Sequence, residues 1–548
     1  MNTIVRLGVV CVILSLAAAA FAETHALLSP YSVRDFGARG DGATKDTASV
    51  QKAIDACSKA GGGTVLFPAG IYLCGSLHLR SAVTLQLDTA ATIKGSKDVN
   101  DYDPVETLPY KNDADEETSF FHHALIWGEG IDHIAIVGEG TIDVNWDKRH
   151  GPKAVALKRC TFVDIKGIRL LNAPNYNISL LGTDYVNIDG VTILNAYADG
   201  IDPDSCRHVR IANCHIESSD DAIVPKTSFS LGERRSCEDI VVTNCYLGTT
   251  AQSFKLGTES GGDFKRIAVS NCVMAGLAPN EPASGGICLE SVDGSNIDGV
   301  VVSNITMVNV RAPVFIRLGN RGRDQATPTP GTLRNVVISG VVATNATYPS
   351  SITGIPGRAV EGITLSDIRI LYRGGEKYTD VLQDIPEQIP AYPTSRMFGV
   401  MPAYGLYCRH ARGLTLRNVQ LAFTDDFCRI TAESRKEMRW ANDGLVTPSE
   451  PGNAGTALVC DDVSELVLTD LKARPGKEHP VVRLSNVCGA MIQASQAPES
   501  TEVFLEISGV QSSKIAVLGN DLRNAKCPVQ KSPDVPRGAV ASKGNLGF

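Results

Sequence analysis

The chain contains 548 residues, of which 60 are acidic and 52 are lysine or arginine, so its formal net charge at pH 7 is −8. A chain with this acidic balance binds the phosphate backbone of nucleic acids poorly, and we expect no nucleic acid among its partners. The length would suffice for three ordinary domains. A repeat protein of the same length can instead form one domain, because its repeats stack around a single long core.

The N-terminal segment, from Met1 to Ala22, has the pattern of a secretory signal peptide. One early cation, Arg6, precedes a short apolar stretch, and Ala20-Phe21-Ala22 stands before the first polar residues. A lipid anchor at Cys11 is a weaker alternative, because the small residues that usually precede a lipidated cysteine are missing. No later run is long and apolar enough to cross a membrane. We therefore expect a secreted or periplasmic protein, cleaved after Ala22, with no membrane span.

One helical pattern lies near the start, in an N-terminal region that we place at residues 23–75. Asp46 is a candidate N-cap, apolar side chains recur at helical spacing at Val50, Ile54 and Cys57, and a run of three glycines ends the pattern. The strands that follow form a stacked repeat, whose first coil would otherwise expose unpaired strand edges. We expect the helix to cap that open end.

A short apolar strand that ends near Asn, Asp or Gly recurs through the middle of the chain. The first copies end at Asn172, Asn195, Asn213, Asn244, Asn271 and Asn304. The interval between successive copies is irregular, and each copy combines a β-branched strand with a polar corner. Such a pattern is typical of a solenoid. The sequence predicts an all-β, single-stranded parallel β-helix over residues 76–475, followed by terminal coils and a C-terminal cap over residues 476–548. The asparagines are expected to form an internal hydrogen-bonded ladder at tight bends.

The cysteines could form disulfides in an exported chain, but their positions favour another interpretation. Cys214, Cys245 and Cys272 each follow an asparagine of the repeat. Residues at the same place in successive coils stack about 4.8 Å apart. Three in a row suit a ladder of buried free thiols better than pairing, because buried cysteine packs as a small hydrophobic residue.

Three aspartates occupy neighbouring repeats. The spacing between Asp199 and Asp220 is close to one coil, so the corner with Asp199 should lie beside the corner with Asp220 and Asp221. Among clustered carboxylates one tends to keep its proton while its partners stay ionised. Glycoside hydrolysis needs such an acid for the leaving oxygen and a base for water. The alternative interpretation is that these aspartates cap bends or bind a cation.

Several motifs carry a resemblance to a known family. The segments YSVRDFGARGDGATKDTASVQKAI, GEGTIDVN, ADGIDPDSC, SSDDAIVPK and LGTESGG resemble the polygalacturonases of glycoside hydrolase family 28, in the pectate-lyase-like β-helix superfamily, from about residue 31 to 310. The resemblance implies a right-handed β-helix and hydrolysis with inversion, in which Asp220 is the general acid and Asp199 and Asp221 activate water. Inversion would place acid and base roughly 6.5 to 9.5 Å apart.

The chain departs from the family pattern where that family binds its substrate. Gln252 stands near the place of a family histidine, and Glu290 stands where the family has the lysine of Arg-Ile-Lys. The resemblance implies that the missing cations hold a galacturonate carboxylate, which Glu290 would repel. We therefore expect an altered subsite for pectin-like or other uronate-containing polysaccharides. Lys255 lies near the position of the missing histidine. By default we interpret Lys255 as a residue that stacks against neighbouring coils and has no role in the site.

Replacement cations are available just after the strand that ends at Asn304. Arginine forks suit sugar carboxylates, although solvated loop charges are an equally good interpretation of each one alone. The residues that we predict to bind substrate are Asp202, Lys226, Tyr197, Gln252, Glu290, Arg317 and Arg321. Two long excursions, residues 373–407 and 424–456, are expected to wall the cleft.

Two alternative functions use the same fold. A polysaccharide lyase would need calcium, which the aspartates could hold, and a basic residue to abstract a proton. A non-catalytic glycan-binding solenoid would keep the aspartates for structure alone. The leading hypothesis, an inverting glycoside hydrolase, requires no cofactor and no metal, has a polysaccharide or oligosaccharide as its partner, and predicts no particular oligomeric state.

Overall fold

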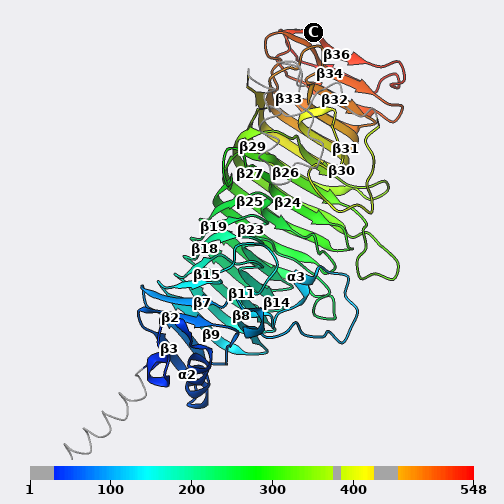
Figure 1. Cartoon of the computed structure of the whole chain (residues 1–548). Helices are drawn as coiled ribbons and strands as arrows, with labels where there is room; N and C mark the ends of the chain where they lie inside the picture. The colour runs from blue at the N-terminus through cyan, green and yellow to red at the C-terminus, as the bar shows by residue number, and fades with distance from the viewer. Residues whose placement is uncertain (1–29, 374–383, 425–454, 548) are drawn as a thin grey trace, which may run out of the picture.

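The computed structural model describes residues 30–373, 384–424 and 455–547. The chain winds into one long right-handed parallel β-helix whose coils stack from the N-terminal to the C-terminal end (Figure 1). Neighbouring coils pair in parallel, as β11 (Lys153–Lys158) does with β14 (Ile178–Leu181). The predicted fold class is confirmed. Within the described residues, no helix is both long and apolar enough to span a membrane, and the proposed signal peptide lies outside them.

Each coil contributes to three stacks of strands. The first stack contains β5 (Leu77–His78), β8 (Ala124–Glu129), β11, β14, β17 (Ile201–Asp204), β22 (Gln252–Leu256), β24 (Ala283–Ser291), β26 (Val310–Leu318), β28 (Ser350–Thr353), β32 (Val482–Ser485), β34 (Thr501–Ser508) and β36 (Ala525–Lys531). The second contains β1 (Tyr31–Ser32), β3 (Gly63–Phe67), β6 (Val83–Leu87), β9 (Asp132–Gly138), β12 (Thr161–Lys166), β15 (Asp184–Asp189), β18 (Arg207–Ala212), β20 (Cys237–Thr243), β33 (Cys488–Gln493), β35 (Ser513–Leu518) and β37 (Val540–Lys543). The third contains β2 (Asp41–Lys45), β4 (Gly70–Cys74), β7 (Ala91–Gly95), β10 (Thr141–Asp143), β13 (Arg169–Leu171), β16 (Thr192–Ala196), β19 (His215–Ser218) and β21 (Tyr246–Thr249).

In later coils a single bent strand serves more than one stack. These long strands are β23 (Phe264–Gly276), β25 (Asn296–Val308), β27 (Thr332–Ala346), β29 (Val360–Tyr372), β30 (Ala403–Phe423) and β31 (Thr456–Ala473). Apolar and polar side chains alternate along them, because successive residues of a strand point to opposite faces. One continuous core therefore runs along the inside of the solenoid, from Val33 to Leu522.

The predicted capping helix is α2 (Thr47–Lys59), at the N-terminal end of the solenoid (Figure 1). It buries Val50, Ile54 and Cys57 against the first coils, as its spacing predicted. Asp46 precedes the helix but does not cap it: its carboxylate accepts hydrogen bonds from the backbone N–H groups of Arg39 and Gly40, at 2.8 and 2.9 Å. The remaining short helices are η1 (Val33–Phe36), η2 (Val99–Asp101) and α3 (Glu116–Ser119).

The asparagines form two external ladders instead of one internal ladder. Asn195 donates to Asn172 at one corner, whereas Asn244 donates to Asn213 at another, both at 3.4 Å. The short step from Asn195 to Asn213 thus joins two different corners and does not measure a coil. All four residues have φ between 54° and 57°, a left-handed conformation that asparagine tolerates at tight bends.

The thiol ladder is present, and the outer surface is mixed in charge. Cys214, Cys245 and Cys272 are buried, and the cysteines that the structure describes, from Cys57 to Cys527, are free thiols.

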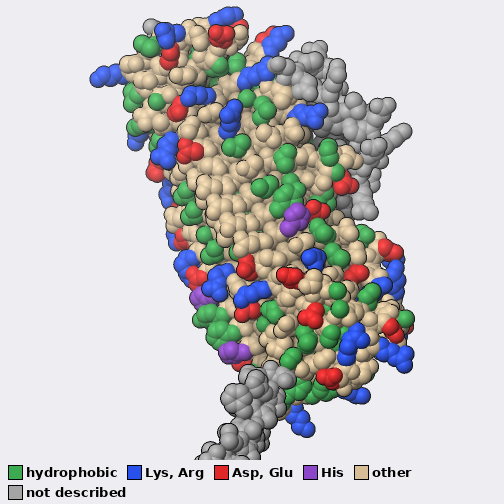
Figure 2. Space-filling model, turned by 90° about the vertical axis from the view of Figure 1, so that its left-hand side faces the viewer, with side chains coloured by type: hydrophobic (Ala, Val, Ile, Leu, Met, Phe, Trp, Pro, Cys, Tyr) green, Lys and Arg blue, Asp and Glu red, His purple; other side chains and the backbone are tan. Residues whose placement is uncertain are grey.

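Figure 2 shows one face of the molecule, on which basic and acidic side chains intermingle toward the lower end and an uncharged band crosses the middle. This face carries no extended patch of a single sign.

Part of one long excursion covers the outside of the first stack. Phe398 and Met401 pack on Cys288 of β24 and Phe315 of β26, in an apolar cluster separate from the main core. The described part of the predicted excursion 373–407 therefore lies against the strands beside the aspartates. The excursion predicted at 424–456 falls almost entirely outside the described residues.

Candidate active site

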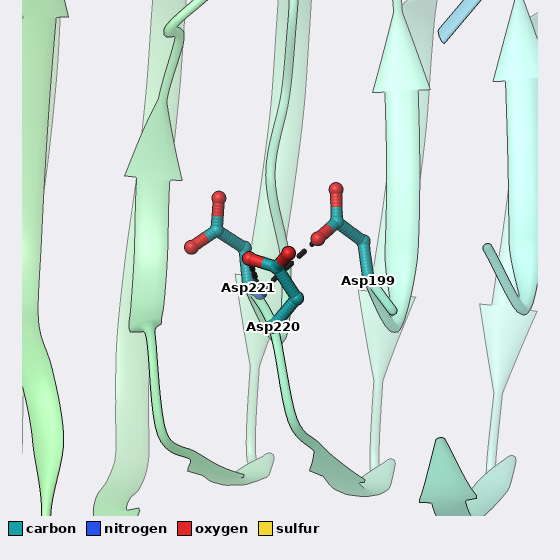
Figure 3. A group of neighbouring side chains, drawn as sticks. All are labelled: Asp199, Asp220 and Asp221. Atoms are coloured by element: carbon teal, nitrogen blue, oxygen red, sulfur yellow. Dashed lines mark hydrogen bonds between the residues drawn. The ribbon is translucent and has the colours of Figure 1, made fainter. Parts of the chain in front are cut away.

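The fold brings the three predicted aspartates together. Asp199 lies in the turn between β16 and β17, and Asp220 and Asp221 follow β19 one coil later. The backbone N–H of Gly200 donates to the carbonyl of Asp221, so Asp199 is level with Asp221 of the next coil and not with Asp220. One carboxylate oxygen from each aspartate lies within 4.8 Å of the others. Figure 3 shows the carboxylates of Asp199 and Asp221 pointing the same way, while Asp220 points elsewhere.

Asp199 and Asp221 lie below the surface, each beside its own lysine. Asp199 is 3% exposed and Asp221 is 4% exposed. Asp199 accepts hydrogen bonds from the Asp221 backbone N–H at 3.1 Å and from Lys226 Nζ at 2.8 Å. Asp221 accepts from the Gln252 backbone N–H and from Lys255 Nζ, both at 3.0 Å. All four oxygens of this pair therefore have a donor.

Asp220 has a different environment. Its side chain is 29% exposed, and its Oδ2 atom accepts from Arg149 Nη1 at 2.5 Å. The same guanidinium donates to both oxygens of Glu117, at 3.1 and 2.5 Å. Arg149 lies on the connection between β10 and β11, and Glu117 lies on α3. Neither residue belongs to a repeat strand, so the sequence pattern carried no signal for this contact.

The proton affinities in the cluster follow from burial and charge. Burial raises the pKa of Asp221 to about 7, with Lys255 opposing the rise and the other two aspartates adding to it. Burial also raises the pKa of Asp220, and the negative charge of Asp199 contributes, while Arg149 opposes both. Like charges this close do not all ionise together, so the cluster holds a proton near neutral pH.

A cavity of about 610 Å³ opens above Asp220, which is the one member of the trio on its wall. The other charged groups that line it are Asp147, Lys148, Arg149, Glu281, Arg311 and Arg396. Four of the lining residues carry a positive charge and three a negative charge. Of the predicted substrate-binding residues, Tyr197 lines this cavity. The wall suits an anionic ligand better than the net charge of the whole chain would suggest.

Asp202 and Lys226 support the cluster from below and do not reach the cavity wall. Both are buried, and Lys226 Nζ lies 2.6 Å from Asp202 Oδ1 while it donates to Asp199 and to the hydroxyl of Tyr176. Their role as direct substrate ligands stays a prediction, and their burial favours an indirect role through Asp199. The Gln252 side chain is largely buried too, and the contact that it makes to the cluster is through its backbone N–H.

Glu290 does not face a ligand. Its side chain is fully buried on β24, and neither carboxylate oxygen has a hydrogen-bond partner. Burial raises its pKa to about 8, with Lys255 opposing the rise and Asp221 adding to it. The carboxyl group is therefore mainly neutral at pH 7. The expectation that Glu290 repels a substrate carboxylate stays a prediction, and the burial and raised pKa of this group argue against it.

Glu290→Gln should change how stability depends on pH. The folded-state pKa of Glu290 lies above its unfolded value of about 4.3, so the stability it confers is full below that value and is lost as pH rises through 8. The amide cannot ionise, so we expect the melting temperature of the variant to exceed that of the wild type by a growing margin from about pH 5 to about pH 9. Thermal melts across that range measure it, and a constant difference would contradict the assignment.

Arg317 and Arg321 are structural residues. The Arg317 side chain is buried on β26, where its guanidinium donates to the carbonyls of Gly354, Glu387 and Gln388. Arg321 donates to both oxygens of Asp293 at 2.9 and 2.6 Å. Neither lines the cavity above Asp220. Their role as replacement cations stays a prediction, and the hydrogen bonds above hold each guanidinium against other protein groups.

The arginines on the cavity wall are not the predicted pair, Arg317 and Arg321. Arg311 comes from β26, close to the predicted pair in sequence, and Arg396 comes from the described part of the excursion over the first stack. The hydroxyl of Ser395 donates to the carbonyl of Ser284, on the same wall, at 3.1 Å. The segment around Arg396 is thereby fixed at the edge of the cavity.

Comparison with known proteins identifies the family. The family model "Glycosyl hydrolases family 28" matches residues 57–390, which include all three aspartates. The chain belongs to this family. It is therefore a glycoside hydrolase on a right-handed parallel β-helix, as the sequence motifs predicted.

The relatives of this family 28 chain are polygalacturonases. It is 28% identical over 369 residues to a probable polygalacturonase from Vitis vinifera, covering 62% of this chain and 74% of the relative. It is 25% identical over 301 residues to an endo-polygalacturonase from Pectobacterium carotovorum subsp. carotovorum, covering 49% and 71%. The solved exopolygalacturonase from Thermotoga maritima superposes with a TM-score of 0.54 at 24% identity, over 63% of this chain and 87% of that chain, which supports the fold.

Proposed function

We propose that this glycoside hydrolase cleaves an acidic, polygalacturonan-like polysaccharide with inversion of configuration. Asp220 is the general acid, and Asp199 and Asp221 together activate the attacking water. One observation carries the proposal: Asp220 stands on the wall of a cavity that four cationic side chains line, while Asp199 and Asp221 lie beneath it, each paired with a buried lysine. The names of the relatives agree with the substrate class.

The environments separate the roles of the carboxylates. Asp220 is the most exposed of the three and has a raised pKa, so it can bring a proton to the leaving oxygen. Lys226 Nζ and Lys255 Nζ donate to Asp199 and Asp221, so each of these buried carboxylates has a counter-charge beside it, which suits a base. The water loses its proton to this pair while Asp220 releases its own, so the charge of the trio is conserved.

The spacing of the carboxylates differs from the expectation for an inverting enzyme. One oxygen of each carboxylate lies within 4.8 Å of the others, because Asp199 is stacked on Asp221 of the next coil and Asp220 adjoins Asp221 in the chain. Burial and complete hydrogen bonding nevertheless keep Asp199 and Asp221 from reaching an anomeric carbon in the cavity. Water is therefore favoured as the nucleophile.

Product stereochemistry tests this assignment. We expect the first product released from an α-linked oligogalacturonide to be the β-anomer, because a single displacement by water inverts the centre. Proton NMR of a fresh digest, recorded before mutarotation, distinguishes the anomers. An α-anomer as first product would mean a covalent intermediate and would overturn the roles given to Asp199 and Asp221.

Substrate comparison tests the proposed substrate class. We expect kcat/KM on polygalacturonic acid to exceed that on the same polymer after full methyl esterification, because only the free acid can pair with the cations of the cavity. A pectic panel that includes rhamnogalacturonan, assayed by reducing-sugar release and product chromatography, measures the preference. Equal rates on the acidic and esterified polymers would contradict it.

No observation favours the lyase alternative. The ammonium groups of Lys226 and Lys255 lie against Asp199 and Asp221, so these two carboxylates have a counter-charge without calcium. Unsaturated products that absorb in the ultraviolet and disappear on chelation would support a lyase, and saturated products support hydrolysis.

The proposed function includes export of the protein from the cytoplasm. The charged, apolar and small-residue zones between Met1 and Ala22 support secretion or transfer to the periplasm after cleavage at Ala22. Sequencing the N-terminus of the mature protein tests this: a first residue other than Glu23 would move the cleavage site, and an intact leader would contradict it.

A further inference from the structure

We propose that Arg149 changes partners during catalysis: it binds Asp220 in the free enzyme and moves to a carboxylate of the substrate in the complex. The inference rests on the proposed function, because it takes Asp220 as the acid. It adds a means by which an acidic sugar, and not a neutral one, prepares the acid for proton transfer.

The geometry places Arg149 between the acid and the cavity. Its Nη1 atom lies 2.5 Å from Asp220 Oδ2, and Arg149 and Asp220 both line the cavity wall. The side chains are 33% and 29% exposed, so an anionic ligand in the cavity competes for the same guanidinium. A planar guanidinium binds two carboxylates at two of its edges, and one edge here is already taken by Glu117.

The two residues that hold this contact come from outside the repeat strands. Arg149 lies on the connection between β10 and β11, and Glu117 lies on the short helix α3, between β7 and β8. Such connections tolerate displacement better than the stacked strands do. Glu117 keeps the guanidinium at the edge of the cavity while its other edge exchanges one carboxylate for another.

Asp220 is surrounded by charges of both signs, and Arg149 is the cation in contact with it. Below it lie Asp199, Asp221 and Lys255, and the effect of burial and of Asp199 is to raise its pKa, which Arg149 and Lys255 oppose. On the cavity wall are Asp147, Lys148, His150, Glu281, Arg311 and Arg396. Loss of the contact with Arg149 therefore favours the protonated form of Asp220.

The substrate carboxylate takes the place of Asp220 on Arg149, and Asp220 accepts a proton from the solvent. Asp220 then gives that proton to the glycosidic oxygen as the bond to the anomeric carbon breaks, and the attacking water loses its proton to Asp199 and Asp221. A methyl ester carries no charge, so it leaves Arg149 on Asp220 and the acid stays ionised.

Arg149→Met tests the exchange through the pH profile and the substrate preference together. In the free variant the pKa of Asp220 rises, so the alkaline limb of kcat/KM should move to higher pH by about one unit. The ratio of kcat/KM for the acidic over the methyl-esterified oligomer should fall about tenfold to a hundredfold, because one charge-paired contact to the acidic substrate is lost. Arg149→Lys keeps the charge, and its alkaline limb should return toward that of the wild type.

Arg169→Met is the matched control, because Arg169 is exposed on β13 and donates to the carbonyl of Glu139. It should leave both readouts unchanged. If Asp220→Asn is inactive but Arg149→Met keeps the wild-type limb and ratio, the exchange is wrong and the proposed function stands. If Asp220→Asn is fully active, the role of the acid itself is wrong. If Arg149→Met shifts the alkaline limb of kcat/KM but leaves the ratio of acidic to esterified substrate unchanged, Arg149 is only a structural partner of Asp220. That result would also overturn the exchange.

Discussion

Asp220→Asn should lower kcat on polygalacturonic acid by about 10³-fold, the contribution typical of a positioned general acid. Asparagine has the same shape but cannot release a proton to the leaving oxygen. The effect should appear in kcat more than in KM, because Asp220 is assigned to the transition state and the cations of the cavity wall remain. Initial rates of reducing-sugar release over a range of substrate concentrations measure both constants.

A matched control separates chemistry from folding. Asp132→Asn removes an exposed aspartate of β9, whose side chain is 58% exposed, and should leave kcat unchanged. Circular dichroism and thermal melts of Asp220→Asn should match the wild type, because its side chain is on the surface of the cavity. Activity within a few-fold of the wild type in a folded Asp220→Asn protein would remove the acid assignment.

Lys255→Met should damage both stability and activity. Lys255 is 4% exposed and its Nζ atom lies 3.0 Å from Asp221 Oδ2, so its loss leaves a buried carboxylate without its counter-charge. Breaking a buried pair in this way typically costs about 3 to 5 kcal/mol of the free energy of unfolding. Urea denaturation measures the loss. Lys265→Met is the control, because Lys265 makes a surface ion pair of the same kind, 2.8 Å from Asp263, that is worth about 1 kcal/mol or less.

The pH dependence of the same variant has a defined direction. Lys255 opposes the rise of the Asp221 pKa, which is about 7, so its removal raises that pKa further. A base with a higher pKa is ionised only at higher pH, and the acidic limb of the pH profile should move upward. The double variant Lys255→Met with Asp221→Asn should regain part of the lost stability, because the unpaired charge is gone. Unchanged stability and an unchanged acidic limb in Lys255→Met would contradict this role.

The buried lysines beside the aspartates offer an explanation for the residues that differ from the family pattern. The position of Glu290 lacks the expected lysine, but Lys255, one coil earlier on β22, reaches Asp221 from below. The carboxyl group of Glu290 is fully buried, has a raised pKa and is not among the residues that line the cavity. Under the proposed function, the altered residues would bear on how the base is held, and the arginines of the cavity wall would bind the substrate carboxylate.

The repeat and the aspartate cluster were predictable from local pattern. Alternation of apolar and polar residues sets which side of a strand is buried, and a spacing near one coil places Asp199 beside Asp221 in any parallel β-helix. The helix over α2 followed from apolar spacing in the same way. Local pattern does not separate the corners that hold Asn195 and Asn213, because corners of different stacks share the same residue preference.

By itself, then, the sequence determined the β-helix, the family and the three carboxylates, since each depends on residues at repeat positions. Only the tertiary structure decided which charges surround them. Arg149 and Arg396 come from connections whose path no repeat fixes, and the predicted Arg317 and Arg321 are held by other protein groups. The physical reason is that strand stacking is set by backbone hydrogen bonds between neighbouring coils, whereas the position of a long charged side chain on a loop depends on contacts distant in sequence.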